Sequence, residues 1–215
     1  MPSIDKKPVA RAWVRLPSGR RLNLLDPTPL DFEPSDLAIG AARTFRWGGH
    51  SIWPWPLSVA QHSMSVLAIG RAQLGDKMTQ KLALAFLLHD ASECLGVCFD
   101  PISPLKPFLG PGYAALDKSL QGVAHTRFGL PFVLPDSWKK PIKKADRLAA
   151  AAEAVYVAGW SEQECREALQ IKLPLLTEDP LQKRYGGRPW EPWSAAVAAE
   201  RFAAELEELT ADQGA

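Results

Sequence analysis

The sequence predicts an all-α fold, a helical bundle with a small β-hairpin near its N-terminus. Apolar residues recur at the three- and four-residue spacing of helices through most of the chain, whereas the alternation typical of strands is confined to its first part. The sequence contains no internal repeat or low-complexity tract, which argues against a solenoid or a coiled coil. With 215 residues, the chain is long enough to bury the core of a single domain.

The N-terminal part predicts a hairpin, a connector and a short helix. In "ARAWVRLPSGRRLNLL", two loosely alternating stretches flank the turn tetrapeptide "PSGR", which is typical of a β-hairpin. The proline-rich "DPTPLDFEPSD" is the connector, and "EPSDLAIGAARTFRW" begins a short helix for which Ser35 or Asp36 is the expected N-cap. From Arg46 to Pro56, glycines and prolines predict a tryptophan-rich loop without helix.

Longer helices are predicted after this loop. Pro141 suits the first turn of one of them, and Gly159 suits its C-cap. The stretch "LPLLTEDPLQKRYGGRPWEPW" is expected to cross irregularly between the last two. The predicted helices cover about 57–74, 79–96, 111–128, 139–158 and 193–209.

Charge and composition argue against several classes of protein. Lysine and arginine number 25 and aspartate and glutamate 24, so no overall field favours a nucleic-acid polymer or an anionic membrane. The first residues lack the apolar core of a signal peptide, and no apolar run approaches the length of a membrane span. Three cysteines do not form a disulfide framework, which suits a reducing compartment. We therefore expect a cytoplasmic protein without a membrane or nucleic-acid partner.

Cys94 and Cys98 are four residues apart and would share one face of a helix. Two thiolates at this spacing could bind a metal, but a zinc ribbon needs a second cysteine pair, which the sequence lacks. Free cysteines usually behave as small buried hydrophobic residues. We therefore favour a packing role for both thiols.

The segment "LALAFLLHDASECLG" places ionisable groups where a buried helix is expected. His89 shares a stripe with the apolar residues seven, four and three positions before it, and Glu93 follows four positions later. Asp90 would lie about 100° further round a continuous helix. Burying a carboxylate without a partner costs several kcal/mol, so these groups need a cation or hydrogen bonds.

Two further helices carry a polar group at an apolar position. His62 is in register with apolar residues of "LSVAQHSMSVLAIG", and Asp146 shares a stripe with apolar residues of "PIKKADRLAAAAEAV". A lone buried histidine is most often satisfied by hydrogen bonds. Two imidazoles and two carboxylates on three helices, however, match the ligands of a divalent metal ion. Zn, Mn, Co, Fe, Ni and Mg all suit such a set.

The order His62, then His89 and Asp90, then Asp146 resembles the H…HD…D signature of the HD-domain superfamily of metal-dependent phosphohydrolases. Five segments resemble sequences of one branch of this superfamily, the 5′-deoxynucleotidases and the small phage deoxynucleoside triphosphohydrolases. These segments are "FRWGGH", "SVAQHS", "LLHDASE", "DPISPLK" and "KKADRLAAAAEA". The resemblance covers about 36–158 and implies the helical fold of that family. It implies one domain over 1–215, with a hairpin and connector (1–33), an HD core (34–160) and a C-terminal extension (161–215).

The resemblance also implies catalytic and binding roles. Glu93 would orient or deprotonate the attacking water, and Asp100 would assist as an acid/base or a second carboxylate. Arg46 and Trp47 would meet the phosphate and the sugar or base, and Lys106 would bind phosphate; an arginine fork suits a bidentate grip on phosphate oxygens. The implied metal ligands are His62, His89, Asp90 and Asp146.

The sequence does not assign a single role to four other residues, two tryptophans and two histidines. Trp53 and Trp55 either stack on a nucleobase or form a hydrophobic lid over the core. His50 contacts phosphate, contacts a second metal ion, or caps the loop. His125 has no such context, and we expect it on a surface helix.

The sequence leaves the reaction open. The substrate is either a deoxynucleoside monophosphate, which gives phosphate, or a triphosphate, which gives inorganic triphosphate. The alternatives are a non-catalytic nucleotide-binding regulatory module and an HD hydrolase of another phosphoester, such as a cyclic dinucleotide or an alarmone. The alanine-rich last helix and the tryptophans suit a homo-oligomer, although the sequence is also compatible with a monomer.

Overall fold

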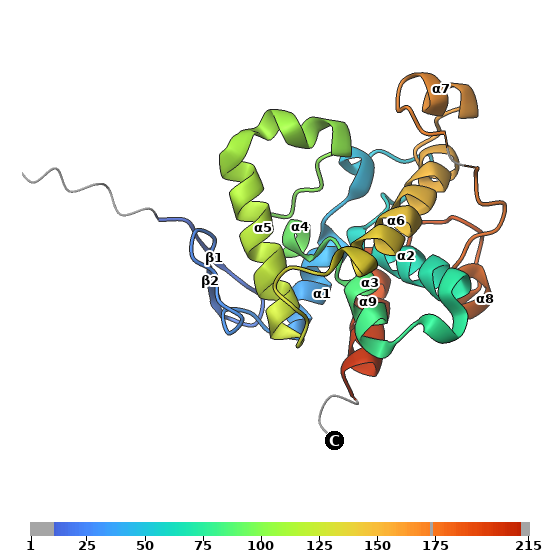
Figure 1. Cartoon of the computed structure of the whole chain (residues 1–215). Helices are drawn as coiled ribbons and strands as arrows, with labels where there is room; N and C mark the ends of the chain where they lie inside the picture. Colours follow the sequence, from blue (N-terminus) through green and yellow to red (C-terminus); the bar gives the residue numbers. More distant parts are fainter. Residues whose placement is uncertain (1–10, 173, 212–215) are drawn as a thin grey trace, which may run out of the picture.

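The computed structural model describes residues 11–172 and 174–211. Within these ranges the chain is mostly helical with one two-stranded antiparallel sheet, so the predicted all-α class with a small hairpin is confirmed (Figure 1). Residues 1–10 of the predicted N-terminal segment and 212–215 of the predicted C-terminal segment lie outside the described residues. Among the described helices, none has the length and apolarity needed to cross a membrane.

The hairpin consists of β1 (Trp13–Arg15) and β2 (Arg21–Asn23). Leu22 on β2 is fully buried, so this strand anchors the hairpin to the core. The turn is also tied to the first helix, because the Ser18 hydroxyl donates to Asp36 Oδ2 at 2.6 Å.

The first helix, α1 (Pro34–Arg43), begins two or three residues earlier than the predicted N-caps imply. Its N-cap is Glu33, not Ser35 or Asp36, because Pro34 is pre-organised for the first helical position. Asp36 stands at the third helical position, where its side chain accepts the Glu33 N–H at 2.8 Å. The predicted N-caps were therefore wrong by two or three residues.

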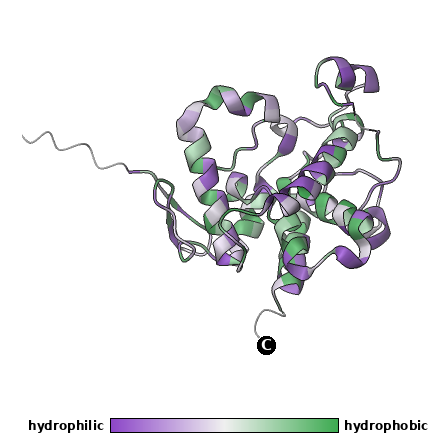
Figure 2. Cartoon of the chain, viewed as in Figure 1, coloured by the Kyte–Doolittle hydropathy of each residue, from purple (hydrophilic) through white to green (hydrophobic). Residues whose placement is uncertain are grey.

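The longer helices pack around one apolar core. Helix α2 lies against α3, α6 and α9, and α9 lies against α1. Hydrophilic and hydrophobic residues alternate along α5 and α9 in Figure 2, as expected of helices with one face in the core. These helices are α2 (Val59–Leu74), α3 (Gln80–Leu87), α5 (Gly110–Arg127), α6 (Asp136–Tyr156) and α9 (Ala195–Thr210).

The predicted helix over 79–96 is interrupted in the middle. Helix α3 ends at Leu87, α4 covers Ala91–Cys94, and His89 and Asp90 lie between them. Neighbouring side chains on a continuous helix point about 100° apart and do not ordinarily meet each other. In the turn they do, because His89 Nε2 lies 3.0 Å from Asp90 Oδ2.

Helix α5 supports this interruption from behind. The Gln121 amide donates to the Leu88 carbonyl at 2.7 Å and accepts the Ser92 N–H at 2.9 Å, so it satisfies a backbone group on each side of the break. The same amide donates to His125 Nε2 at 2.7 Å. His125 is buried, and the expectation that it lies on the surface was wrong; its Nδ1 donates to the Phe132 carbonyl at 3.3 Å.

Helix α6 begins three residues before the predicted start. Pro141 therefore lies inside the helix and not in its first turn, and the carbonyl it leaves unpaired belongs to Ser137, which is exposed to water. Gly159 has a left-handed φ of 80° but lies two residues beyond the actual C-cap, Val157.

Several short elements were not predicted. The glycine-rich loop contains a 3-10 turn, η1, in which Trp47 and Gly48 adopt left-handed angles. Another 3-10 segment, η3, contains Lys106 and leads into α5. The other short elements are η2 (Gly75–Lys77), α7 (Glu162–Glu167) and α8 (Gln182–Tyr185); η1 is Arg46–Gly49 and η3 is Ser103–Leu109.

Candidate metal centre

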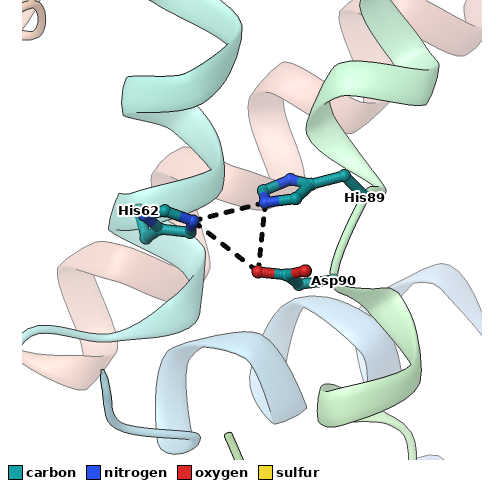
Figure 3. A group of neighbouring side chains, drawn as sticks. All are labelled: His62, His89 and Asp90. Carbon is teal, nitrogen blue, oxygen red and sulfur yellow. Dashed lines mark hydrogen bonds and ion pairs between the residues drawn. The ribbon is translucent and has the colours of Figure 1, made fainter. Parts of the chain in front are cut away.

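Three side chains from two segments converge beside α2. His62 comes from α2, whereas His89 and Asp90 come from the turn between α3 and α4. One ligand atom of each lies within 4.8 Å of the other two (Figure 3). His62 is fully buried on the apolar stripe predicted for it, and the other two are partly exposed.

The outer nitrogen of each imidazole determines which atom faces this group. His89 Nδ1 donates to the Phe86 carbonyl at 2.9 Å, and His62 Nδ1 donates to Glu153 Oε1 at 2.6 Å. A carbonyl and an ionised carboxylate only accept, so each ring, once its second proton has been released, presents the lone pair of Nε2 to the group. The two Nε2 atoms are 3.3 Å apart, which favours a cation close to both.

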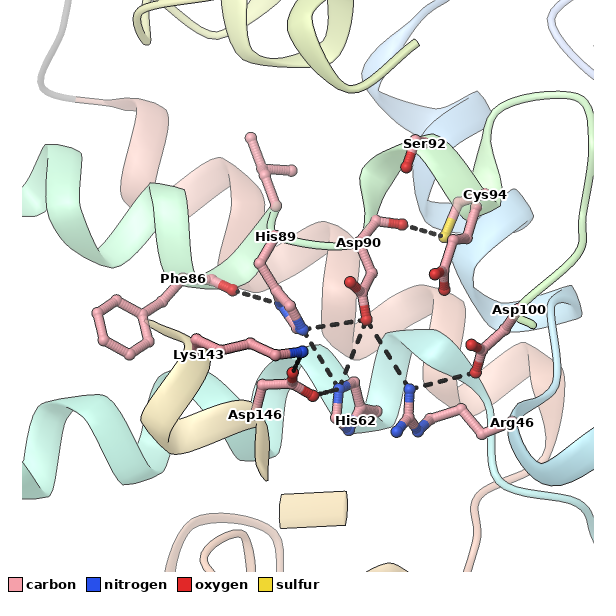
Figure 4. Close-up of polar contacts among 12 residues, drawn as sticks. Arg46, His62, Phe86, His89, Asp90, Ser92, Cys94, Asp100, Lys143 and Asp146 are labelled. Carbon is pink, nitrogen blue, oxygen red and sulfur yellow. Dashed lines mark hydrogen bonds and ion pairs between the residues drawn. The ribbon is translucent and has the colours of Figure 1, made fainter. Parts of the chain in front are cut away.

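Asp146 on α6 faces the same point. Its Oδ1 lies 3.4 Å from His62 Nε2, and its Oδ2 accepts from Lys143 Nζ at 2.7 Å (Figure 4). All four predicted ligands are thus brought together by three parts of the fold.

The spacing of the donor atoms fits a divalent ion. Two ligands at about 2.1 Å from one ion lie about 3.0 Å apart at octahedral angles and about 3.4 Å apart at tetrahedral angles. From His62 Nε2 to the carboxylates of Asp146 and Asp90 the distances are 3.4 and 3.6 Å, and from His89 Nε2 to Asp90 the distance is 3.0 Å. Imidazole and carboxylate donors suit borderline or hard divalent ions. His62, His89 and Asp90 could therefore hold a metal ion.

The electrostatics of the group favour a positive charge at its centre. Burial and the charge of Arg46 would lower the pKa of His62, yet Glu153 and Asp146 outweigh both and raise it to about 9. Burial would raise the pKa of Asp90, but His89 holds it well below its usual range. His62 and His89 likewise lower the pKa of Asp146 against the effect of burial. His62 and these carboxylates stabilise each other's charged forms.

Arg46 is held beside the group by carboxylates. Its Nε donates to Glu153 Oε2 at 2.8 Å, its Nη1 donates to Asp100 Oδ2 at 3.2 Å, and Nη1 lies 3.8 Å from Asp90 Oδ2. Burial would lower the pKa of Arg46, but these carboxylates raise it well above its usual value. The structure therefore brings Arg46 and Asp100, both predicted site residues, next to the candidate ligands.

Glu153 is a residue of this site that the sequence prediction missed. It lies on α6, seven residues after Asp146, and its side chain is buried. A signal for it was present, because it is the lone carboxylate in "LAAAAEAVY" and falls on the stripe of Asp146.

Glu93 lies on α4 and is also buried. Its Oε1 accepts from Lys106 Nζ at 2.8 Å, whereas the buried Oε2 has no hydrogen-bond partner among the described residues. Burial and the charges of Asp90 and Asp100 raise the pKa of Glu93 to about 9, against the opposite effect of Lys106. Such a carboxyl group is a candidate acid or base.

A cavity of about 240 Å³ opens onto these groups. Its walls contain Arg46, Glu93, Asp100 and Lys106, all of them predicted site residues. Residues that were not predicted also contribute, namely Lys143 and Arg147 on α6 and the segment 169–171 after α7.

The residues of the tryptophan-rich loop differ in their relation to the cavity. Trp47 lines it, and its indole N–H is buried without a partner among the described residues. Trp53 packs against a second, smaller apolar cluster, and its indole N–H donates to the Tyr156 carbonyl at 2.8 Å. These contacts suit the predicted hydrophobic lid. Trp55, in contrast, is exposed. His50 is exposed and does not belong to the cavity lining, so the structure does not bring it to the site.

The two cysteines do not share a helix face, because α4 ends at Cys94. Cys94 is buried, and its thiol donates to the Asp90 carbonyl at 3.4 Å. Cys98 is exposed with a left-handed φ of 48°. The packing role therefore holds for Cys94 and not for Cys98.

Comparison with known proteins gives a relative of undetermined function. No family model matches the chain. An uncharacterized protein of Rhodobacter capsulatus is 48% identical over 155 residues, which cover 72% of this chain and 77% of that protein. The chain therefore belongs to the same family as that protein.

Proposed function

We propose that the chain is an HD-domain metal-dependent phosphohydrolase acting on deoxynucleoside phosphates. One observation carries the proposal: His62, His89 and Asp90 converge at ligand spacing, with Asp146 3.4 Å from His62 Nε2, beside a cavity that Glu93 also lines. A divalent ion at that point would supply Lewis acidity, neutralising charge on phosphoryl oxygens and making water more acidic. The order of the four residues along the chain is that of the HD signature.

The cations around the cavity support phosphate as the group that binds there. Arg46 is anchored through Nε by Glu153 and through Nη1 by Asp100, which leaves Nη2 of its guanidinium for a phosphate oxygen. Lys106 and Lys143 each pair with a carboxylate, at 2.8 and 2.7 Å. A bound phosphate would compete with the two carboxylates for these ammonium groups. Its oxygens would replace the ion pairs that the lysines lose.

Glu93 is the proposed acid/base. The oxygen of an attacking water forms a bond to phosphorus while its proton passes to the free Oε2 of Glu93. The bond from phosphorus to the leaving oxygen breaks, and that oxygen takes up a proton, which the Glu93 carboxyl group can return. Glu93 ionises more readily beside a divalent cation, because an opposite charge stabilises the carboxylate. Asp100 assists by holding Arg46 at 3.2 Å.

The experiment is a nucleotide panel read by its inorganic product. Protein loaded with Mn²⁺, Co²⁺ or Mg²⁺ is incubated with each deoxynucleoside mono- and triphosphate, and phosphate and triphosphate are quantified separately. Release of phosphate from monophosphates supports a nucleotidase, and release of triphosphate supports a triphosphohydrolase. Absence of both products with every ion would reject the proposal.

The role of Glu93 gives a prediction for one substitution. Glu93→Gln keeps the size of the side chain but removes the base, so kcat should fall by about 10²- to 10⁴-fold while Mn²⁺ binding stays within a few fold. Steady-state kinetics and calorimetric titration measure the two quantities. Glu200→Gln, at an exposed position of α9, is the control and should leave both unchanged. An unaltered kcat for Glu93→Gln would assign the proton transfer to another group.

A further inference from the structure

Glu153 contacts two functional groups at once. Its Oε1 accepts the His62 Nδ1 hydrogen at 2.6 Å, and its Oε2 accepts the Arg46 Nε hydrogen at 2.8 Å. The carboxylate is 3% exposed, so water does not replace either contact. One buried side chain therefore connects the innermost candidate ligand with the cation expected to bind phosphate.

The contact with His62 determines the form of the imidazole. A carboxylate that accepts from Nδ1 keeps a hydrogen on that atom and leaves Nε2 to face the cluster. Ligand histidines in metal sites commonly have such a partner, which fixes the ring orientation and increases the basicity of the donor nitrogen. If the contact with Glu153 were lost, the His62 ring could not rotate to find another partner, because it is fully buried.

The contact with Arg46 determines the plane of the guanidinium. With Nε bound to Glu153 and Nη1 bound to Asp100 at 3.2 Å, the group is held from two sides. Arg46 lies in η1, a turn in which Trp47 and Gly48 have left-handed angles, so the short turn itself offers little support.

We propose that Glu153 is a positioning residue that orients His62 toward the metal ion and Arg46 toward the phosphate, and so links the two halves of the site. The link to phosphate rests on the function proposed above, whereas the link to the metal ion rests only on the ligand cluster.

The experiment compares two buried glutamates. Glu205 on α9 is 2% exposed and pairs with Arg71 at 2.8 Å and with Arg184, far along the sequence from the cluster. Glu153→Gln and Glu205→Gln each remove one buried charge from a pair of basic partners. A purely structural role for Glu153 would make the two variants alike.

The first readout is Mn²⁺ affinity, measured by calorimetric titration of folded protein. His62 and Arg46 use different oxygens of Glu153, and an amide replaces one of these acceptors with an NH₂ group. Glu153→Gln should therefore weaken Mn²⁺ binding by roughly 10- to 100-fold, and Glu205→Gln should leave it within twofold. Glu153→Asp retains the charge but is one methylene too short for both contacts, and it should weaken binding as well; it decides the question if Glu153→Gln does not fold. The second readout is the affinity of the Mn²⁺-loaded protein for inorganic phosphate, which should fall in Glu153→Gln.

The inference is overturned if the folded Glu153 variants bind Mn²⁺ within twofold of the unmodified protein, or if Glu205→Gln loses as much affinity. Failure of the proposed function looks different. In that case no nucleotide is hydrolysed, yet Glu153→Gln still loses Mn²⁺ affinity and Glu205→Gln does not.

Discussion

At the scale of single residues, His62 shows how burial and charge compete on one side chain. Full burial favours the neutral imidazole, but Glu153 at 2.6 Å and Asp146 at 3.4 Å favour the imidazolium. The carboxylates prevail and raise the pKa of His62 to about 9. At neutral pH the protein without metal therefore keeps a proton where the ion would bind, and metal binding must release it.

This balance predicts how stability depends on pH. The pKa of His62 is raised from 6.5 to about 9 and that of Glu93 from 4.5 to about 9, so the folded state binds more protons than the unfolded chain between pH 6.5 and 9. The stability that each group contributes is complete below its unfolded pKa and is lost as the pH rises through about 9. The free energy of unfolding of chelator-treated protein, from urea titrations, should therefore fall across this window.

Glu93→Gln is the internal control for the pH experiment. It removes one of the two titrating groups, so the free energy of unfolding should fall less steeply with pH than in the unmodified protein. A free energy of unfolding that rises from pH 6.5 to 9 in both proteins would contradict the assignment of raised pKa values.

At the scale of elements, the position of Glu93 depends on how closely α4 approaches α1. A Cβ added at Gly40 of α1 would lie 2.2 Å from the Cys94 carbonyl oxygen at the end of α4. Backbone atoms cannot rotate away as a side chain can. A glycine at this position therefore allows α4, and Glu93 with it, to rest directly on α1.

Gly40→Ala should separate the two helices. Although alanine is the better helix former, the overlap should lower the free energy of unfolding by about 1–3 kcal/mol and reduce kcat, because Glu93 moves with α4. Gly112→Ala on α5 is the matched control, since its added methyl group meets open space; it should be neutral or stabilising by up to about 1 kcal/mol. Urea titrations of both variants measure the difference, and equal stabilities would show that α1 and α4 separate without cost.

The interruption between α3 and α4 shows what local sequence patterns can and cannot predict. The apolar stripes around His62 and Asp146 depend on helical periodicity alone, and both residues lie where these stripes direct them. The turn at His89 and Asp90 depends on Gln121, a residue of another helix, so periodicity predicted one helix where there are two. The segment 169–171 reaches the cavity through tertiary packing, and no local sequence pattern predicts that it lines the cavity.

At the scale of the whole molecule, the candidate ligands join α2, the turn after α3, and α6. An ion that binds these groups only in the folded state adds about 2.7 kcal/mol of stability at a free concentration one hundred times its Kd. For a chain of this size, that corresponds to a rise in Tm of about 5–10 °C. Thermal unfolding with Mn²⁺ and with a chelator measures the effect.

Asp146→Asn serves as the control for this experiment. It removes the anionic ligand from α6, so the difference in Tm between the Mn²⁺ and chelator samples should shrink markedly. Equal Tm values for the unmodified protein in the two samples would argue against a metal ion that joins the three elements.

The packing of α1 on α9 has a consequence for synthesis on the ribosome. These helices lie near opposite ends of the chain, and Leu37 and Ala41 of α1 share the core with Phe202 and Leu206 of α9. Translation delivers α1 long before α9, so part of the apolar face of α1 waits uncovered while the intervening helices are made, a period in which nascent chains bind chaperones or aggregate. The core closes only when the last helix has left the exit tunnel.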